Sequence, residues 1–242
     1  MRVAFAGQVS KDLAFPDDIE DAMAFATEAG RVAISDGASE SYDSRSWAQL
    51  LVRRFIADTR VDLGWLDEAI GAYGKQSDFT DLSWSHQDAF DRGSFASLLG
   101  IEYLPEQKLI EVCCVGDSLA VLIDRQGCRR RAFQYLCAAL FGRRPQLLST
   151  HPARNTRLTV PDFFRSHTEA WPISEPELRV VLCMTDAMGE WALRHDECGR
   201  PVWNELLALH DQTDLDVLVA EARESRGMHI DDVTLVRLSF DD

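Results

Sequence analysis

The hydrophobic residues near the N-terminus come in short runs that alternate or cluster over a few positions, which is typical of β-strands. Three such runs cover residues 2–9 (RVAFAGQV), 21–27 (DAMAFAT) and 31–36 (RVAISD). The tripeptide EAG before the third run ends in glycine, which adopts the positive φ angle of tight turns at little cost. The pattern therefore predicts three consecutive strands at the start of the chain.

The pattern then changes to a helical period. Between residues 44 and 59, Trp47, Leu50 and Leu51 begin an apolar stripe along one face of a predicted helix. Ser44 is expected to be its N-cap, because a serine oxygen can accept a hydrogen bond from a free amide of the first turn. Residues 62–77 predict a second helix.

Strand-like runs return between residues 94 and 133. Their sequences are SFASLLGIEYL, KLIEVCCVGDSLAVLID and CRRRAF, separated by the turn-forming segments PEQ and RQG. Consecutive strands joined by short turns predict an antiparallel meander rather than a βαβ repeat. Residues 134–176 carry scattered prolines and predict an irregular insert.

The C-terminal part supplies the remaining elements. ELRVVLCMTD predicts a strand, AMGEWALRH and LDVLVAEARES predict helices, and DVTLVRLSF predicts a final strand. This order favours an α+β fold, a sandwich of two antiparallel β-sheets packed face to face and flanked by helices. The length of 242 residues suits a single domain, 1–242, with the insert near 134–176.

Composition narrows the choice of compartment and partners. The formal net charge of −15 disfavours nucleic acid and anionic membranes as partners. The cysteines form no C-x-x-C pair, and several lie inside apolar runs, which indicates reduced thiols and a reducing compartment. The N-terminal apolar stretch is too short for a signal peptide, and no segment is long enough to span a bilayer. We therefore expect a cytoplasmic protein.

Four apolar runs end in, or lie beside, an aspartate: Asp36, Asp117, Asp186 and Asp231. Each alone is explained by the frequency of aspartate in turns and helix caps. Together at one end of a sandwich, their carboxylates would repel one another unless a cation neutralised them. Oxygen ligands without His or Cys select Mg²⁺ or Mn²⁺, and two such ions about 3.5–4 Å apart can polarise a phosphoryl group. Gly37, after Asp36, lets a backbone carbonyl approach a metal without a Cβ in the way.

Six short motifs lie in a recognisable order: IEDA, SDGAS, RGSFAS, VGDSLAVL, MTDAMGE and DDVTLVRL. In this order the chain resembles the metal-dependent protein serine/threonine phosphatase family, type 2C, in its compact bacterial form. Each motif is weak alone, but together they run from Glu20 to Leu238. The resemblance implies one phosphatase-like domain with an αββα fold and a two-metal centre at one end of the β-sandwich.

The resemblance also implies roles for individual residues. Asp36 would bridge two Mn²⁺ or Mg²⁺ ions, the Gly37 carbonyl would bind one of them, and Asp186 and Asp231 would bind the other, which makes these three aspartates the residues of catalysis. Three more acids complete the implied set of metal residues. Glu20 and Asp21 would hold metal-bound waters, and Asp117 would bind a third, weaker ion. Glu190, one helical turn after Asp186, would supply the other acid for that ion.

The chain departs from the family pattern at several positions. Ala38 stands where many members have a histidine proposed as general acid, and Pro16 stands where many have a phosphate-gripping arginine. Lys11 is the nearest upstream basic residue, at the wrong spacing. Arg143 and Arg144 are candidates to replace the arginine, although a solvated loop explains them better.

Two further expectations concern residues near the last strand. Asp232 follows Asp231 directly, and we expect it to support the site from its rim, where Asn would be tolerated. No histidine sits at a spacing that predicts a ligand cluster, so surface or packing roles are expected for all of them.

These observations favour an enzyme that hydrolyses phosphoserine and phosphothreonine in proteins through a water activated by two metal ions. Its expected partners are a phosphorylated protein substrate and a cognate Ser/Thr kinase. An alternative is a catalytically weak phosphatase-like module that binds phosphoproteins in a regulatory role. A two-metal hydrolase of another phosphoester is a third alternative. Turnover of an aryl phosphate and of phosphopeptides discriminates among them.

Overall fold

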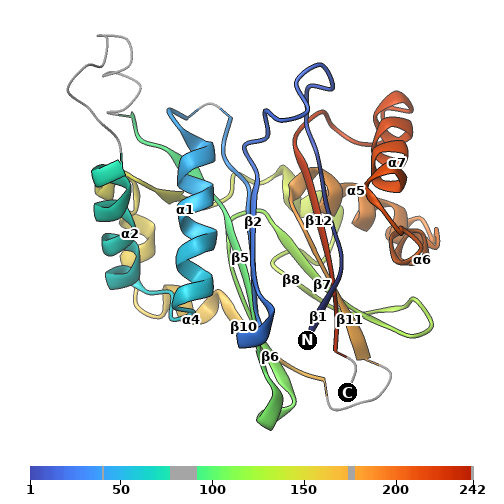
Figure 1. The fold of residues 1–242 in the computed structure, drawn as a ribbon, viewed down its shortest axis with the longest axis horizontal. Coiled ribbons are helices and arrows are strands. Elements are labelled where there is room, and N and C mark those ends of the chain that lie inside the picture. Colours follow the sequence, from blue (N-terminus) through green and yellow to red (C-terminus); the bar gives the residue numbers. More distant parts are fainter. Residues whose placement is uncertain (40, 77–91, 174–177, 241–242) are drawn as a thin grey trace.

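The computed structural model describes residues 1–39, 41–76, 92–173 and 178–240. Two five-stranded sheets form its centre, and their paired strands are antiparallel (Figure 1). The first sheet has the order β1-β12-β11-β7-β8, with bounds Arg2–Val9, Val233–Ser239, Leu178–Met184, Leu119–Asp124 and Arg129–Phe133. The second has the order β10-β6-β5-β3-β2, with bounds Thr168–Pro172, Leu109–Val115, Leu98–Leu104, Arg31–Ser35 and Ala22–Ala26. Two short strands, β4 (Phe95–Ala96) and β9 (Leu148–Ser149), form a separate pair.

Helices cover the outer face of each sheet (Figure 1). Helices α1 (Ser44–Ala57) and α2 (Leu63–Gln76) lie on the side of the second sheet. Helices α5 (Asp186–Glu197), α6 (Val202–Leu207) and α7 (Gln212–Glu224) lie on the side of the first. A single helical turn, α4 (Phe163–Ser166), precedes β10. The predicted α+β fold, an αββα sandwich of two antiparallel sheets flanked by helices, is confirmed.

Three apolar layers hold the four structural layers together. In β3, Val32 and Ile34 point into the layer between the two sheets, whereas Ala33 points toward the helices. This alternation follows from the two-residue period of a strand. The helical layer packs closely, because a Cβ on Gly100 of β5 would lie 2.2 Å from the ring of Phe55. Any larger side chain at position 100 would therefore push α1 away from the sheet.

Most predicted elements lie where the sequence placed them, and the main differences are as follows. The N-cap of α1 is Asp43, whose carboxylate accepts a hydrogen bond from the Ser46 amide at 3.1 Å, so the prediction of Ser44 is wrong. The segment predicted as irregular also contains β10, which was not predicted as a strand because of its polar residues and its proline. Proline is tolerated there because β10 is an edge strand. Helix α6 was not predicted.

Two further expectations concern membrane-spanning segments and the number of domains. Among the helices of the described segments, none is long and apolar enough to cross a bilayer. The single domain over residues 1–242 stays a prediction.

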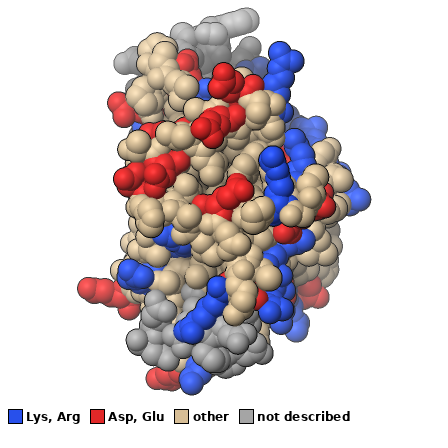
Figure 2. All heavy atoms as spheres, turned by 90° about the vertical axis from the view of Figure 1, so that its right-hand side faces the viewer, with Lys and Arg blue, Asp and Glu red and all other residues tan. Residues whose placement is uncertain are grey.

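Charged side chains are unevenly distributed on the face that carries α6 and α7. Figure 2 shows acidic side chains gathered over one part of this face and Lys and Arg along another edge. Exposed acids of α7 include Asp216, Glu221 and Glu224.

Candidate metal centre

The four strand-end aspartates converge on one small cavity. Asp36 follows β3, Asp117 lies in the turn between β6 and β7, Asp186 begins α5 directly after β11, and Asp231 lies just before β12. All four line a cavity of about 110 Å³. The complete lining is Asp36, Gly37, Ala38, Ser39, Asp117, Leu147, Asp186 and Asp231. Both sheets thus contribute acids to the same point, as the sequence predicted.

Hydrogen bonds from Ser97 fix the backbone that carries Asp36. The Asp36 amide donates to Ser97 Oγ at 3.0 Å, and the Ser97 amide donates to the Asp36 carbonyl at 2.8 Å. The hydroxyls of Ser97 and Ser118 lie 2.9 Å apart, which links the same point to the turn that carries Asp117. Ser97 therefore positions two of the acids. The motif RGSFAS contains it, but the sequence alone gave no reason to single it out.

Gly37 is required by close packing. A Cβ at this position would lie 2.7 Å from the Glu20 carbonyl oxygen and 3.0 Å from Ser44 Cβ. The segment after β3 can therefore approach the start of α1 and the loop before β2 only because residue 37 has no side chain.

The carboxylates destabilise one another's charged forms. Desolvation, followed by the charges of Asp21 and Asp186, raises the pKa of Asp36 well above its usual range. Desolvation and the charge of Asp186 raise the pKa of Asp117 to about 7 and also raise the pKa of Asp231. The Asp36 carboxylate has no hydrogen-bond partner among the described residues. Carboxylate oxygens that repel one another in a buried cavity fit a hard divalent cation.

Glu20 and Asp21 lie outside the cavity lining. Glu20 forms an ion pair with Lys11 and accepts a hydrogen bond from Ser44 Oγ at 2.7 Å. Lys11 also donates to Ser39 Oγ at 2.6 Å, and Ser39 lines the cavity. The basic side chain judged to have the wrong spacing therefore reaches the edge of the site through the fold.

Asp21 is buried behind the cavity. Its carboxylate accepts hydrogen bonds from Thr234 Oγ1 at 2.6 Å and from Thr185 Oγ1 at 3.0 Å. Desolvation is the main reason that the pKa of Asp21 lies well above its usual range. Asp21 thus joins the loop before β2 to the ends of β11 and β12.

Asp232 is buried, so its expected place at the rim is wrong. Its two carboxylate oxygens accept hydrogen bonds from the amides of Lys11 and Glu20, each at 2.7 Å. Asp231 points into the cavity instead, and its carbonyl accepts a hydrogen bond from Arg223 of α7 at 2.5 Å. The two neighbouring acids therefore have different tasks, because one lines the site and the other anchors the loop that carries Glu20.

His229 lies between the carboxylates of Asp186 and Glu190. Glu190 does not line the cavity; its carboxylate forms an ion pair with Arg194 and lies 3.2 Å from His229 Nδ1. His229 Nε2 lies 3.4 Å from Asp186 Oδ2. The hydrogen bond with Asp186 is the main reason that the pKa of His229 is raised. Ligand atoms of Asp186, His229 and Asp231 all lie within 4.8 Å of one another.

The expectation that no histidine joins a ligand cluster is therefore wrong for His229. Its position two residues before Asp231 was visible in the sequence. The distance to Asp186 was not, because 43 positions separate the two residues and only the pairing of β11 with β12 brings them together.

The arginines proposed to replace the phosphate-gripping residue lie elsewhere. Arg143 and Arg144 are exposed, and neither lines the cavity. Leu147, a few residues later, is the member of this segment that reaches it.

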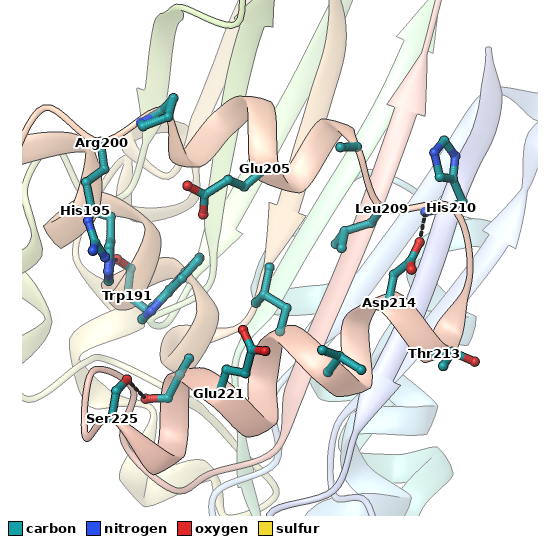
Figure 3. A pocket seen from close by; sticks show the side chains of 15 residues that line it. Trp191, His195, Arg200, Glu205, Leu209, His210, Thr213, Asp214, Glu221 and Ser225 are labelled. Atoms are coloured by element: carbon teal, nitrogen blue, oxygen red, sulfur yellow. Dashed lines mark hydrogen bonds between the residues drawn. The ribbon is translucent and has the colours of Figure 1, made fainter.

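A larger cavity of about 820 Å³ lies between α5, α6 and α7 (Figure 3). Acids from two helices, Glu205, Asp214 and Glu221, line it together with apolar side chains such as Leu209. Within the described segments, however, only Asp186, His229 and Asp231 have ligand atoms close enough to form a group of three potential metal ligands, and two of them, Asp186 and Asp231, line the smaller cavity. Metal chemistry therefore favours the smaller cavity over the larger one.

Comparisons with known proteins agree with this architecture. No protein-family model and no curated protein matches the chain. Solved structures do match it over nearly its whole length, and those described below are serine/threonine or serine phosphatases, so the chain has the fold of these enzymes. The predicted resemblance to this family is thus confirmed at the level of the fold.

Three of these structures illustrate the match. The serine/threonine phosphatase PstP/Ppp of Mycobacterium tuberculosis is 16% identical, with a TM-score of 0.57 and 100% of both chains covered. The serine/threonine phosphatase Stp1 of Staphylococcus aureus is 14% identical, with a TM-score of 0.58 and 100% and 98% of the two chains covered. A bacterial serine phosphatase is 13% identical, with a TM-score of 0.59 and 98% and 97% covered.

Proposed function

We propose that the chain is a protein serine/threonine phosphatase that depends on Mn²⁺ or Mg²⁺. The observation that carries the proposal is the convergence of Asp36, Asp117, Asp186 and Asp231 on one cavity. This cavity has no Lys or Arg among its described lining residues to neutralise the carboxylates, so a cation is the natural counter-charge. The fold shared with solved serine/threonine phosphatases supports the choice of reaction.

The residues present fit the metal set that the resemblance implies. Asp36, the Gly37 carbonyl, Asp186 and Asp231 would hold two ions, and Asp117 would hold a third. Bound divalent cations supply Lewis acidity, which polarises a phosphoryl group and makes water nucleophilic near neutral pH. The chain itself supplies a rigid cage, because hydrogen bonds from Ser97 hold the Asp36 backbone in place.

Side chains around the cavity have supporting tasks in this proposal. Glu20 and Asp21 lie outside the cavity lining and would orient water on the ions. Lys11 places a positive charge at Ser39, on the cavity wall, where it would attract the dianionic phosphate of a substrate. Leu147 contributes an apolar wall that would keep bulk water away from the phosphoryl group.

The substrate in this proposal is a phosphoserine or phosphothreonine protein, and the natural partner is the kinase that made it. The described cysteines are free, which agrees with a reducing, cytoplasmic setting. The acidic surface suits neither nucleic acid nor an anionic membrane as a partner.

A regulatory module that binds phosphoproteins without hydrolysing them is the second candidate. Ala38 cannot act as an acid, and Pro16 cannot grip phosphate. Retention of all four cavity aspartates favours the enzyme, because mere recognition of a phosphate would be better served by basic side chains.

The decisive experiment measures turnover of an aryl phosphate and of matched phosphoserine, phosphothreonine and phosphotyrosine peptides. The enzyme should be inactive after chelation and regain activity with Mn²⁺ or Mg²⁺. Turnover of the aryl phosphate without any phosphopeptide would indicate another phosphoester substrate. Metal and phosphopeptide binding without turnover would establish the regulatory module instead.

A further inference from the structure

We infer that His229 is a nitrogen ligand of the cation held by Asp186 and Asp231, and that this chain therefore selects Mn²⁺ and similar transition-metal ions over Mg²⁺. The inference rests on the proposed function, because it concerns the same centre. It adds a nitrogen donor to a set of ligands that otherwise consists of carboxylate and carbonyl oxygens.

The spacing of the donor atoms fits a shared ion. His229 Nε2 and Asp186 Oδ2 lie 3.4 Å apart. Two ligands bound at about 2.1 Å to one ion are separated by roughly 3.0–3.4 Å in octahedral or tetrahedral geometry. Asp231 also places a carboxylate oxygen within 4.8 Å of both. The three side chains could thus converge on one ion with little movement.

The other ring nitrogen has the partner that a metal-binding histidine requires. His229 Nδ1 lies 3.2 Å from Glu190 Oε2. Metal-binding histidines commonly donate this second N–H to a carboxylate, which fixes the tautomer and leaves the first nitrogen free to bind the ion. Asp186 and Glu190 lie four residues apart on the same face of α5, so the helix aligns the ligand with the positioning acid.

Glu190 has a different task in this arrangement from the one the resemblance implies. Its carboxylate already contacts Arg194 and His229, and it does not line the cavity. Glu190 is therefore a positioning residue for His229, rather than a direct ligand of a third ion.

An imidazole donor changes the preference of the site. Carboxylate ligands suit both Mg²⁺ and Mn²⁺, whereas imidazole suits transition-metal ions such as Zn²⁺ and Fe²⁺. Mn²⁺ is a softer ion than Mg²⁺ and accepts a nitrogen ligand more readily. Loss of His229 should therefore reduce affinity for the transition-metal ions and leave the affinity for Mg²⁺ largely unchanged.

A protonated His229 acting as a fixed counter-ion of Asp186 and Glu190 explains the same contacts. The two explanations predict opposite effects of a substitution. A ligand that is removed lowers metal affinity, whereas a competing cation that is removed raises it.

The first test is calorimetric titration of the metal-free protein with Mn²⁺ and with Mg²⁺. His229→Ala should weaken Mn²⁺ binding by at least about 10-fold, because loss of a direct ligand should cost no less than the roughly 10- to 100-fold typical for loss of a partner that only orients a ligand, and it should weaken Mg²⁺ binding by less than about threefold. Glu190→Gln keeps an acceptor for Nδ1–H and should cause a smaller loss. The matched control is His210→Ala, because His210 is exposed and lies on the wall of the larger cavity. Unchanged or tighter Mn²⁺ binding by His229→Ala would overturn the inference.

The second test detects the nitrogen directly. Pulsed electron paramagnetic resonance of the Mn²⁺-loaded protein should show ¹⁴N coupling to the ion, which His229→Ala abolishes and His210→Ala retains. Full Mn²⁺ binding and phosphatase activity without ¹⁴N coupling would overturn this inference and leave the proposed function intact. No binding of either ion to the unaltered protein would overturn both.

Discussion

Asp117→Asn should stabilise the metal-free protein at the expense of its function. The pKa of Asp117 is about 7 in the folded protein, raised by desolvation and by the charge of Asp186, against a usual value of 3.8. Because the folded pKa lies above the unfolded one, this residue's contribution to stability is fully present below about pH 4. It is lost as the pH rises through 7. Asparagine has nearly the shape of the protonated acid but never ionises.

The size of the effect follows from that difference in pKa. Each pKa unit corresponds to about 1.4 kcal/mol, so ionised Asp117 costs the folded state about 4 kcal/mol above pH 8. At about 2.1 cal/mol/K of unfolding entropy per residue, this change raises the melting temperature of a chain of 242 residues by about 8 °C. Near pH 4 the variant and the unaltered protein should have the same free energy of unfolding.

The assay is chemical denaturation in excess chelator at several pH values between 4 and 9, repeated with saturating Mn²⁺. At a concentration 100 times its Kd, the metal should stabilise the unaltered protein by about 2.7 kcal/mol. It should stabilise the variant by less, so the difference in free energy of unfolding between the two proteins should become smaller. Asp124→Asn is the control, because this buried acid accepts hydrogen bonds from Cys128 N at 2.8 Å and Arg130 Nε at 2.6 Å, and its replacement should destabilise the protein at pH 8. The reasoning would be refuted if Asp117→Asn were less stable than the unaltered protein and the difference in free energy of unfolding between the two did not depend on pH.

Three further substitutions test the proposed centre. Asp36→Asn should lower kcat by at least about 100-fold at saturating metal without loss of the fold, because a neutral amide cannot balance two dications; steady-state kinetics and circular dichroism check this. Asp231→Asn should lower metal affinity, measured by calorimetry. Asp232→Asn should mainly lower the free energy of unfolding, by about 1–3 kcal/mol. The reason is that an asparagine side chain has only one oxygen, so it cannot accept hydrogen bonds from the backbone amides of both Lys11 and Glu20. Wild-type stability of Asp232→Asn in urea would contradict this. Gly37→Ala should reduce both stability and Mn²⁺ affinity, because its Cβ would lie 2.7 Å from the Glu20 carbonyl oxygen; unchanged Mn²⁺ titrations would argue against a carbonyl ligand at this position.

The sequence alone determined most of the elements and the acids that end them. Local patterns report local structure: the two-residue period of β3 and the helical stripe of α1 depend only on neighbouring positions. An aspartate at the end of an apolar run is likewise visible without knowing the fold. For this reason the αββα architecture and the acids Asp36, Asp117, Asp186 and Asp231 could be predicted together.

The tertiary structure decided what surrounds those acids. Lys11 reaches Ser39, Ser97 holds Asp36, and His229 reaches Asp186 only because strands distant in sequence end at the same point. Asp232 is buried for the same reason, since the loop that carries Lys11 and Glu20 folds over it. A side chain's spacing along the chain says little about such contacts, because sheet order and register bring together residues that local periodicity cannot relate.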